Sequence, residues 1–319
     1  MSASAADLVR DAASRSDTGR QTRAAARLMS LLEREPHRLA ELVANRAGDP
    51  WPAPRLVLGI TGAPGSGKSS LTDVLVQSLR ARRPKRRVGV IAVDPSSPLT
   101  GGAVLGDRVR MMRHATDPEV FIRSLATRGH LGGLSLGVRG VLRVMGLIGC
   151  DVVILETVGV GQSEVEVAGI ADLVAVVLAP GHGDSVQLLK AGILEIADVL
   201  IVNKSDLDGA NELYRSLLST LRLAKSATES PRVLQTSVAA NAGIEELVDL
   251  IDSALDKDGE SWQSTRASSL VRDVGDAVLE QALQRVREVG VSGESVVSGE
   301  QSVDEAVSDL LRRARDAQR

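Results

Sequence analysis

Aromatic side chains are almost missing from this sequence. Phe121, Tyr214, Trp51 and Trp262 supply the aromatic content of 1% in a chain of 319 residues. Proteins that bind single-stranded nucleic acid usually stack the bases on aromatic rings. The net charge of −3 also leaves no excess of cations for a phosphate backbone. The sequence therefore argues against nucleic-acid binding, and it predicts a core built from Leu, Val, Ile and Ala.

Cysteine and long apolar segments are equally scarce. Cys150 is the single cysteine and opens an apolar run, so we expect a buried structural thiol. One cysteine can form neither a disulfide within the chain nor a cysteine-rich zinc site. The first twenty residues lack the apolar stretch of a secretory signal, and no run approaches 18 apolar residues. We therefore expect a cytoplasmic protein with no membrane association.

Short apolar runs alternate with amphipathic stretches through the middle of the chain. The runs are apolar throughout, which is typical of strands buried on both faces of a parallel sheet. The pattern predicts an α/β fold, a doubly wound and mostly parallel sheet, in residues 51–257. Residues 1–50 are predicted to form helices that break near 14–19 and 33–37, and residues 258–319 a C-terminal helical arm. The expected strands are 55–61, 87–93, 119–125, 151–156, 172–179, 198–203 and 231–237.

A phosphate-binding loop follows the first expected strand. The stretch "GITGAPGSGKSS" contains a glycine, four residues, and then Gly67-Lys68-Ser69 at the start of a helical pattern, which is the P-loop motif in its required context. Glycines let backbone N–H groups approach phosphate oxygens, and Lys68 supplies a charge to the β- and γ-phosphates. The alternative is a Gly/Ser-rich turn with a chance lysine, which the strand-to-helix context disfavours. The predicted nucleotide-binding residues here are Gly62, Ala63, Pro64, Gly65, Ser66, Gly67, Lys68, Ser69 and Ser70.

A second motif predicts which base is bound. "LIVNKSD" places Asn203, Lys204 and Asp206 at the end of an expected strand. A carboxylate there can accept two hydrogen bonds from guanine, whereas adenine would leave it unsatisfied. Asn203 can tie this loop to the P-loop, and the stem of Lys204 can cover the base. The loop after the last strand can offer N–H groups to guanine O6 and contains Ser237, Val238 and Ala239. The sequence therefore predicts GTP and GDP as ligands in preference to adenine nucleotides.

Three carboxylates follow expected strands or lie in a glycine-rich loop. Asp94 ends one strand, Asp107 stands in "TGGAVLGDRVRM", and Glu156 ends another strand. Mg²⁺ prefers oxygen ligands and keeps several waters. We therefore expect Ser69 to bind it directly, Asp94 and Asp107 to bind it directly or through water, and the longer Glu156 to hold a magnesium-bound water. With Lys68, these acids are the candidate catalytic groups. Taken singly, Asp94 could instead cap a turn before Pro95, and Asp107 could be a helix N-cap.

Two further loops carry polar residues at suggestive spacing. "LETVGVGQSE" places Gly159 and Gln162 after Glu156, where an N–H of Gly159 can sense a γ-phosphate. "LAPGHGDSVQLLKAGI" contains Asp184, Gln187 and Lys190 at three-residue steps. By itself the second pattern describes an N-capped helix with exposed polar residues.

With these residues in view, the chain resembles the MeaB/ArgK family, the SIMIBI-class GTPase chaperones of cobalamin-dependent acyl-CoA mutases. The resemblance rests on "VDPSSPLTGGAVLGDRVRM", "RSLATRGHLGGLS", "ILETVGVGQSEVEVA" and "GDSVQLLKAGILEIADVLIVNKSD". It implies that segments 94–111 and 157–168 are switches, and that segment 180–190, with Asp184, Gln187 and Lys190, is a third switch facing the mutase. It also implies a homodimer formed by the C-terminal arm, and a GTP-controlled role in loading adenosylcobalamin into a partner, chiefly methylmalonyl-CoA mutase.

Some positions depart from the family's pattern. Arg108 and Ala103 stand where lysine and serine are common, and the third switch lacks a second lysine. The client could therefore be another acyl-CoA mutase, such as isobutyryl- or hydroxyisobutyryl-CoA mutase. Two other functions remain as alternatives. A GTPase metallochaperone would need Cys and His ligands for its metal, and the chain has one cysteine and four histidines. A protein kinase-like phosphotransferase would want an acceptor-binding feature, and no motif supplies one.

Overall fold

The computed structural model describes residues 4–35, 38–39, 42, 52–94, 112–114, 116–126, 133–157, 167–181, 196–223, 230–256 and 312. The chain divides into two compact units, Met1–Ser269 and Leu270–Arg319. The elements below all belong to the first unit. The predicted boundaries at residues 50 and 257 and the predicted helical arm remain predictions, since residues 258–319 other than Arg312 lie outside the described part of the chain.

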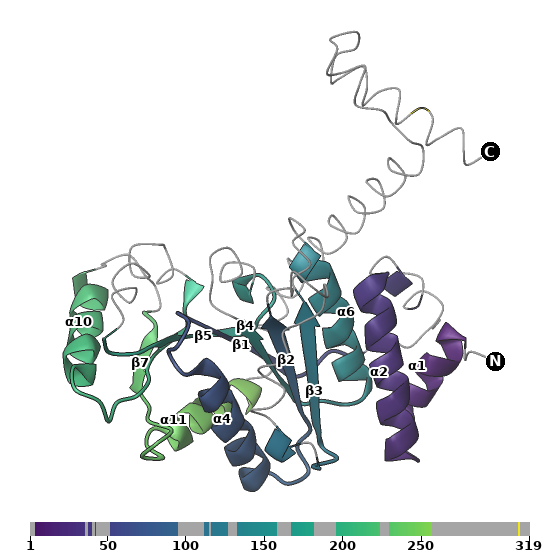
Figure 1. Ribbon diagram of the computed structural model, residues 1–319, viewed down its shortest axis with the longest axis horizontal. Coiled ribbons are helices and arrows are strands. Elements are labelled where there is room, and N and C mark those ends of the chain that lie inside the picture. Colours follow the sequence, from purple (N-terminus) through teal and green to yellow (C-terminus); the bar gives the residue numbers. More distant parts are fainter. Residues whose placement is uncertain are drawn as a thin grey trace. The chain divides into compact units, whose positions relative to one another are not determined.

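Seven strands form one sheet in the order β3-β2-β4-β1-β5-β6-β7 (Figure 1). Every neighbouring pair is parallel. The strands are β1 Leu56–Thr61, β2 Val88–Asp94, β3 Val120–Ala126, β4 Val152–Thr157, β5 Leu173–Leu178, β6 Val199–Val202 and β7 Arg232–Gln235. Each one lies at a position that the sequence predicts. The α/β, doubly wound fold is confirmed.

Helices cover both faces of the sheet because neighbouring strand residues point to opposite sides. In β1, Leu58 belongs to the core beneath α4 (Lys68–Arg82) and α11 (Ile244–Asp256). Its neighbour Val57 belongs to the core shared with α2 (Thr18–Arg34), α6 (Gly133–Leu147) and α10 (Ala210–Leu223). Both residues are buried, which explains why the strands are apolar throughout. No helix within the described ranges is long and apolar enough to cross a membrane.

The two N-terminal helices begin at side-chain caps. In α1 (Ala5–Ala13), Ser4 and Asp7 form a capping box, in which each side chain faces the other's backbone N–H. In α2, the N-cap Asp17 accepts a hydrogen bond from the N–H of Arg20 at 3.0 Å. The predicted break near residues 14–19 therefore matches the gap between the end of α1 at Ala13 and the N-cap of α2 at Asp17.

Arg87 joins the N-terminal helices to the sheet. This side chain is buried, and its guanidinium donates to Gln21 Oε1 at 3.0 Å and to the carbonyl of Ile148. Gln21 in turn donates to the carbonyl of Ala12 at 2.9 Å, so α1, α2 and β2 share one buried network. The guanidinium also lies over the ring of Phe121, 5.7 Å from its centroid. Cys150 is buried nearby, as predicted, and burial raises the pKa of its thiol.

Carboxylates satisfy backbone N–H groups at the amino edge of the sheet. In each case an aspartate just before one strand accepts from a backbone N–H at, or directly before, the start of a neighbouring strand. The pairs are Asp172 with Val57 at 2.8 Å, Asp198 with Val174 at 2.7 Å, and Asp151 with Arg87 at 3.0 Å. Buried backbone donors need such partners. The opposite, carboxyl edge is left to the loops that carry the sequence motifs.

Candidate nucleotide-binding site

The predicted P-loop connects the carboxyl end of β1 to the start of α4. Its backbone takes positive φ at Gly62 (137°) and at Gly67 (92°). A Cβ at Gly62 would lie 2.1 Å from the carbonyl oxygen of Val177, and one at Gly67 would lie 2.5 Å from Nδ2 of Asn203. Both positions therefore require glycine for two reasons, the backbone conformation and the close neighbour.

The first turn of α4 has the features of an anion site. Its N-cap is Gly67, which has no side chain to bond the first N–H groups of the helix. Ser66 is 1% exposed, and its Oγ has no hydrogen-bond partner among the residues described. The N–H groups of a helix N-terminus, the positive end of the helix dipole and a buried hydroxyl suit phosphate oxygens.

Lys68 is folded back onto the P-loop. Its Nζ donates to the carbonyl of Gly62 at 2.7 Å and to that of Ala63 at 3.0 Å, and the residue is 7% exposed. The loop carbonyls therefore compensate the buried ammonium. The charge already lies inside the loop that is predicted to surround the phosphates.

Ser69 meets Glu156 across the sheet edge. The hydroxyl of Ser69 donates to Oε1 of Glu156 at 2.5 Å. Glu156 is 3% exposed and pairs in register with Ile60 of β1 and Ala92 of β2. Two predicted Mg²⁺ ligands are thus brought together, and their oxygen donors suit the ion.

The other two predicted acids are Asp94 and Asp107, of which the structure describes only the backbone of Asp94. The backbone of Asp94 ends β2 at the same carboxyl edge of the sheet, in register with Ala126. Its side chain and the whole of Asp107 lie outside the described residues. Their predicted roles at the ion, and the alternative capping roles, therefore remain predictions.

The loop after β6 is tied directly to the P-loop. Nδ2 of Asn203 donates to the carbonyl of Ser66 at 2.9 Å, and the ammonium of Lys204 donates to the carbonyl of Gly65 at 2.8 Å. Lys204 takes a φ of 55°, which turns the chain sharply after the strand. The predicted tie from Asn203 to the P-loop is present. The aliphatic stem of Lys204, which is predicted to cover the guanine base, lies beside the P-loop.

Asp206 is held from the neighbouring loop. The hydroxyl of Ser237 donates to Oδ1 of Asp206, and it accepts from the N–H of Ala240 at 3.0 Å. Asp206 is exposed, and the contact with Ser237 uses only one of its two carboxylate oxygens. Val238 and Ala239 follow in a turn beside it, half-buried and exposed respectively. The structure therefore brings both predicted base loops together.

Two residues near this site have no short motif that would have predicted them. Thr236 is fully buried, and its hydroxyl donates to Oδ1 of Asn203 at 3.0 Å, which fixes the amide that holds the P-loop. Leu207 is 50% exposed and directly follows Asp206, so it offers apolar surface at the base loop. Of the predicted switch residues, Gly159, Gln162, Asp184, Gln187 and Lys190 lie outside the described part of the chain.

This arrangement defines a class. A strand, a glycine loop and a helix N-terminus meet at the carboxyl edge of a parallel sheet, an arrangement that suits a phosphate, and a second loop carries an exposed carboxylate beside it. The chain is a P-loop GTPase. A family model described as methylmalonyl Co-A mutase-associated GTPase MeaB matches residues 26–290, and the chain belongs to this family.

Individual relatives agree with this assignment. A Pyrococcus abyssi protein named as a GTPase is 48% identical over 233 residues, which cover 72% of this chain and 71% of the relative. The Escherichia coli protein GTPase ArgK is 43% identical over 204 residues, 62% of this chain and 61% of the relative. A crystal structure of an LAO/AO transport system kinase superposes with a TM-score of 0.63 at 27% identity and covers 98% of this chain and 97% of that one. The resemblance to the MeaB/ArgK family is confirmed.

Proposed function

We propose that this GTPase is a chaperone for an adenosylcobalamin-dependent acyl-CoA mutase, which it protects and helps to load with cofactor. The observation that carries this proposal is the match of residues 26–290 to a mutase-associated GTPase family. The assembled P-loop and base loops supply the nucleotide-dependent part of such a role. Methylmalonyl-CoA mutase is the first client to test.

The phosphates of GTP are held by the P-loop in this proposal. The uncapped N–H groups of α4 and the hydroxyl of Ser66 donate to phosphate oxygens. Lys68 exchanges its bonds to the carbonyls of Gly62 and Ala63 for bonds to the β- and γ-phosphates. Because the ammonium is already desolvated inside the loop, little further desolvation opposes this exchange.

Mg²⁺ would be held by Ser69 and Glu156, with Asp94 and Asp107 from the neighbouring segments. When bound, the ion neutralises charge on the β- and γ-phosphate oxygens. The hydrogen bond from Ser69 to Glu156 places both oxygens beside the start of α4, next to the P-loop. We expect slow intrinsic hydrolysis, since the sequence offers no evident arginine finger in cis.

Guanine is selected by the two base loops. Asp206 accepts from the base, and Ser237 holds the carboxylate in position for this task. The turn that contains Val238 and Ala239 would offer N–H groups to O6 of the base. Because Asn203 connects the base loop to the P-loop, base and phosphate recognition are mechanically linked.

The switches carry the nucleotide state to the partner in this proposal. Gly159 and Gln162 would respond to the γ-phosphate, and Asp184, Gln187 and Lys190 would face the mutase. A homodimer formed through residues 258–319 would present two such surfaces. Adenosylcobalamin would belong to the mutase, and this chain need not bind it tightly.

The proposal is tested by binding and hydrolysis measured on the same protein. Purified protein loaded with GDP or a non-hydrolysable GTP analogue is mixed with methylmalonyl-CoA mutase or isobutyryl-CoA mutase, and complex formation is measured by pull-down and calorimetry. We expect one mutase to bind in a nucleotide-dependent manner and to raise GTP turnover. If neither mutase binds in any nucleotide state, the chaperone role is wrong while the GTPase assignment stands.

Lys68→Ala supplies the internal control for the nucleotide site. We expect this variant to lose nucleotide binding or hydrolysis, because the ammonium of Lys68 is the cation held inside the P-loop by the carbonyls of Gly62 and Ala63. Lys85→Ala is the matched control, since Lys85 is an exposed lysine beyond the far end of α4. Unchanged turnover in Lys68→Ala would remove the P-loop assignment.

A further inference from the structure

A cavity of about 540 Å³ lies between α2 and β3, away from the nucleotide site. It is lined by Thr116–Pro118, which precede β3, and by the first half of that strand. Because all strands are parallel, these residues lie toward the amino edge of the sheet, whereas the P-loop lies at the carboxyl edge. Cavities of about 300–1,000 Å³ are the usual size for small-molecule sites. This cavity is therefore a second candidate site.

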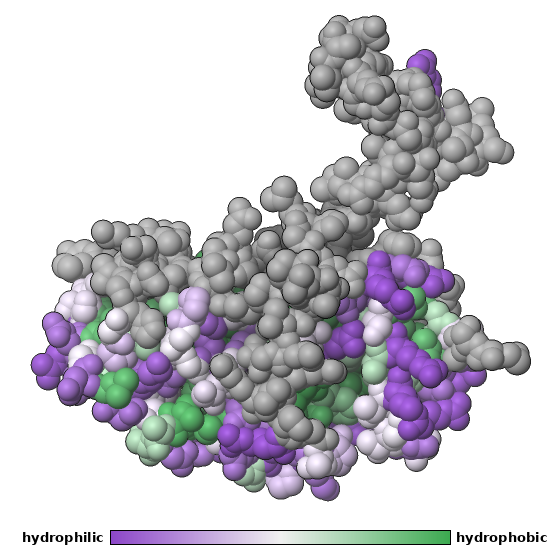
Figure 2. All heavy atoms as spheres, viewed as in Figure 1, coloured by the Kyte–Doolittle hydropathy of each residue, from purple (hydrophilic) through white to green (hydrophobic). Residues whose placement is uncertain are grey.

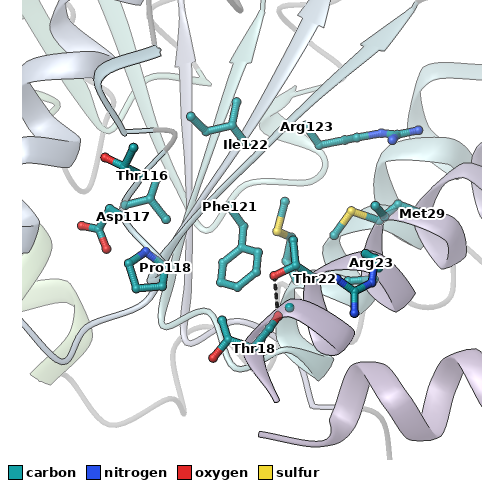
Figure 3. A pocket seen from close by; sticks show the side chains of 15 residues that line it. Thr18, Thr22, Arg23, Met29, Thr116, Asp117, Pro118, Phe121, Ile122 and Arg123 are labelled. Carbon is teal, nitrogen blue, oxygen red and sulfur yellow. Dashed lines mark hydrogen bonds between the residues drawn. The ribbon is translucent and has the colours of Figure 1, made fainter.

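The floor of the cavity is apolar and adaptable. Met29, Phe121 and Met145 line it and are 4%, 8% and 0% exposed. Phe121 is the chain's one phenylalanine, and Figure 3 shows its ring in the middle of the cavity, between Thr22 on α2 and Pro118. Figure 2 shows hydrophobic atoms set back beside the hydrophilic surface of α2 in this region. Methionine side chains adjust to ligands of different shape.

Two arginines that line the cavity have donors without partners. Arg23 on α2 is exposed and makes no hydrogen bond or ion pair with any described residue. The Nε of Arg123 is buried and has no partner in the described chain, although its Nη2 donates to Glu33 at 2.6 Å and to Ser30 at 3.1 Å. Because the Nε of Arg123 is buried, the accessible cation of the lining is Arg23.

The acidic residue of the lining, Asp117, is already paired with a cation. Asp117 accepts two hydrogen bonds from Arg80, at 2.8 and 3.1 Å, and these bonds hold the pKa of its carboxyl below the ordinary value. The hydroxyl of Thr22 donates to the carbonyl of Thr18 at 2.8 Å (Figure 3). The cation of Arg23 is therefore the charge in the lining that no described group compensates.

We propose that this cavity binds a small organic anion. Its apolar body would lie on Met29, Phe121 and Met145, and its carboxylate or phosphate head would lie at Arg23. This site is separate from the nucleotide site and does not depend on the proposed mutase.

The test uses three probes that share one naphthalene body and differ in the charge of the head group. These are 2-naphthoate, 2-naphthyl phosphate and the neutral 2-naphthalenemethanol. Protein with ¹³C-labelled methionine methyl groups is titrated with each probe and followed by NMR. The chain has five methionines, two of which line the cavity. We expect saturable shifts at Met29 and Met145, with the anions bound more tightly than the alcohol, and the two head groups show whether carboxylate or phosphate is preferred.

Variants of α2 separate a built site from general charge attraction. We expect Arg23→Gln to weaken both anions about tenfold and to leave the alcohol unchanged, because it removes a charge-assisted hydrogen bond. Arg27→Gln is the matched control, one turn further along the same helix, exposed and outside the lining. Ala26→Leu, on the exposed rim, should weaken all three probes by filling space.

Three results would overturn the proposal. The methyl signals of Met29 and Met145 could stay in place at saturating probe. The alcohol could bind as tightly as the anions. Arg23→Gln and Arg27→Gln could weaken the anions equally. Each variant's methyl spectrum reports in the same experiment whether the protein is folded.

Discussion

Replacing Asn203 by alanine would cut the connection between the base loop and the P-loop. The side chain of Asn203 is 2% exposed and makes two hydrogen bonds, one to the carbonyl of Ser66 at 2.9 Å and one from the hydroxyl of Thr236 at 3.0 Å. Alanine removes both bonds, so the carbonyl of Ser66 and the buried hydroxyl of Thr236 each lose their bond to Asn203.

The cost follows from the number of groups that lose a partner. A typical hydrogen bond contributes about 1 kcal/mol net, and a buried group left unsatisfied costs about 1–3 kcal/mol. Two such groups therefore predict a loss of about 2–6 kcal/mol in the free energy of unfolding for Asn203→Ala. Thr236→Val removes only the second bond, leaves one group unsatisfied and should cost about 1–3 kcal/mol. The double variant should cost less than the sum, because both changes remove the same bond.

Urea denaturation without nucleotide measures these losses, and fluorescent GDP binding measures their effect on the site. Asn211→Ala is the matched control, since the Oδ1 of Asn211 accepts from Gln235 at 3.0 Å in an exposed place. We expect this control to lose less than 1 kcal/mol and to bind GDP normally. Asn203→Ala should bind GDP about tenfold more weakly, because the P-loop loses a fixed neighbour.

The reasoning is refuted if Asn203→Ala is as stable as Asn211→Ala. It is equally refuted if the losses of Asn203→Ala and Thr236→Val simply add in the double variant. In the first case the two bonds do not contribute to the folded state. In the second case the bond between Asn203 and Thr236 does not couple the two side chains.

Three further predictions concern other parts of the molecule. Asp206→Asn should reduce the preference for GTP over xanthosine triphosphate at least tenfold in competition binding, because the charge-assisted bonds to guanine are lost; an unchanged preference would contradict the base assignment. Arg87→Met should lower the free energy of unfolding by about 3 kcal/mol and expose residues 5–34 to proteolysis, because the buried network to Gln21 and Ile148 is broken; a proteolysis pattern like the wild type would argue against it. Asp117→Asn should be less stable than the wild type at pH 7, and the difference should be smaller at pH 3. The bonds from Arg80 lower the pKa of the folded carboxyl, so its contribution is present above about pH 4 and lost as the pH falls through the folded value; a difference between the two proteins that is the same at both pH values would show that this ion pair is not the source.

Much of this protein can be predicted from short stretches of sequence. The strands follow from apolar runs, because residues buried on both faces need no alternation. The P-loop and base-loop residues are predicted from motifs whose chemistry depends on local backbone geometry. The structure places Gly67 and Lys68 between β1 and α4, and Asn203 and Asp206 in the loop after β6. Even the tie from Asn203 to the P-loop could be expected, since both loops leave the same edge of the sheet.

Other features depend on which strands and helices become neighbours. The bond from Ser69 to Glu156 exists because β1 pairs with β4, which joins residues 87 positions apart. The role of Thr236 and the buried network of Arg87 have no local signature, since their partners come from distant segments. The cavity between α2 and β3 likewise arises only when an N-terminal helix packs beside the edge of the sheet. Local patterns determine which elements form and which loops bind phosphate and base, whereas contacts across the chain exist only once tertiary packing has chosen each element's neighbours.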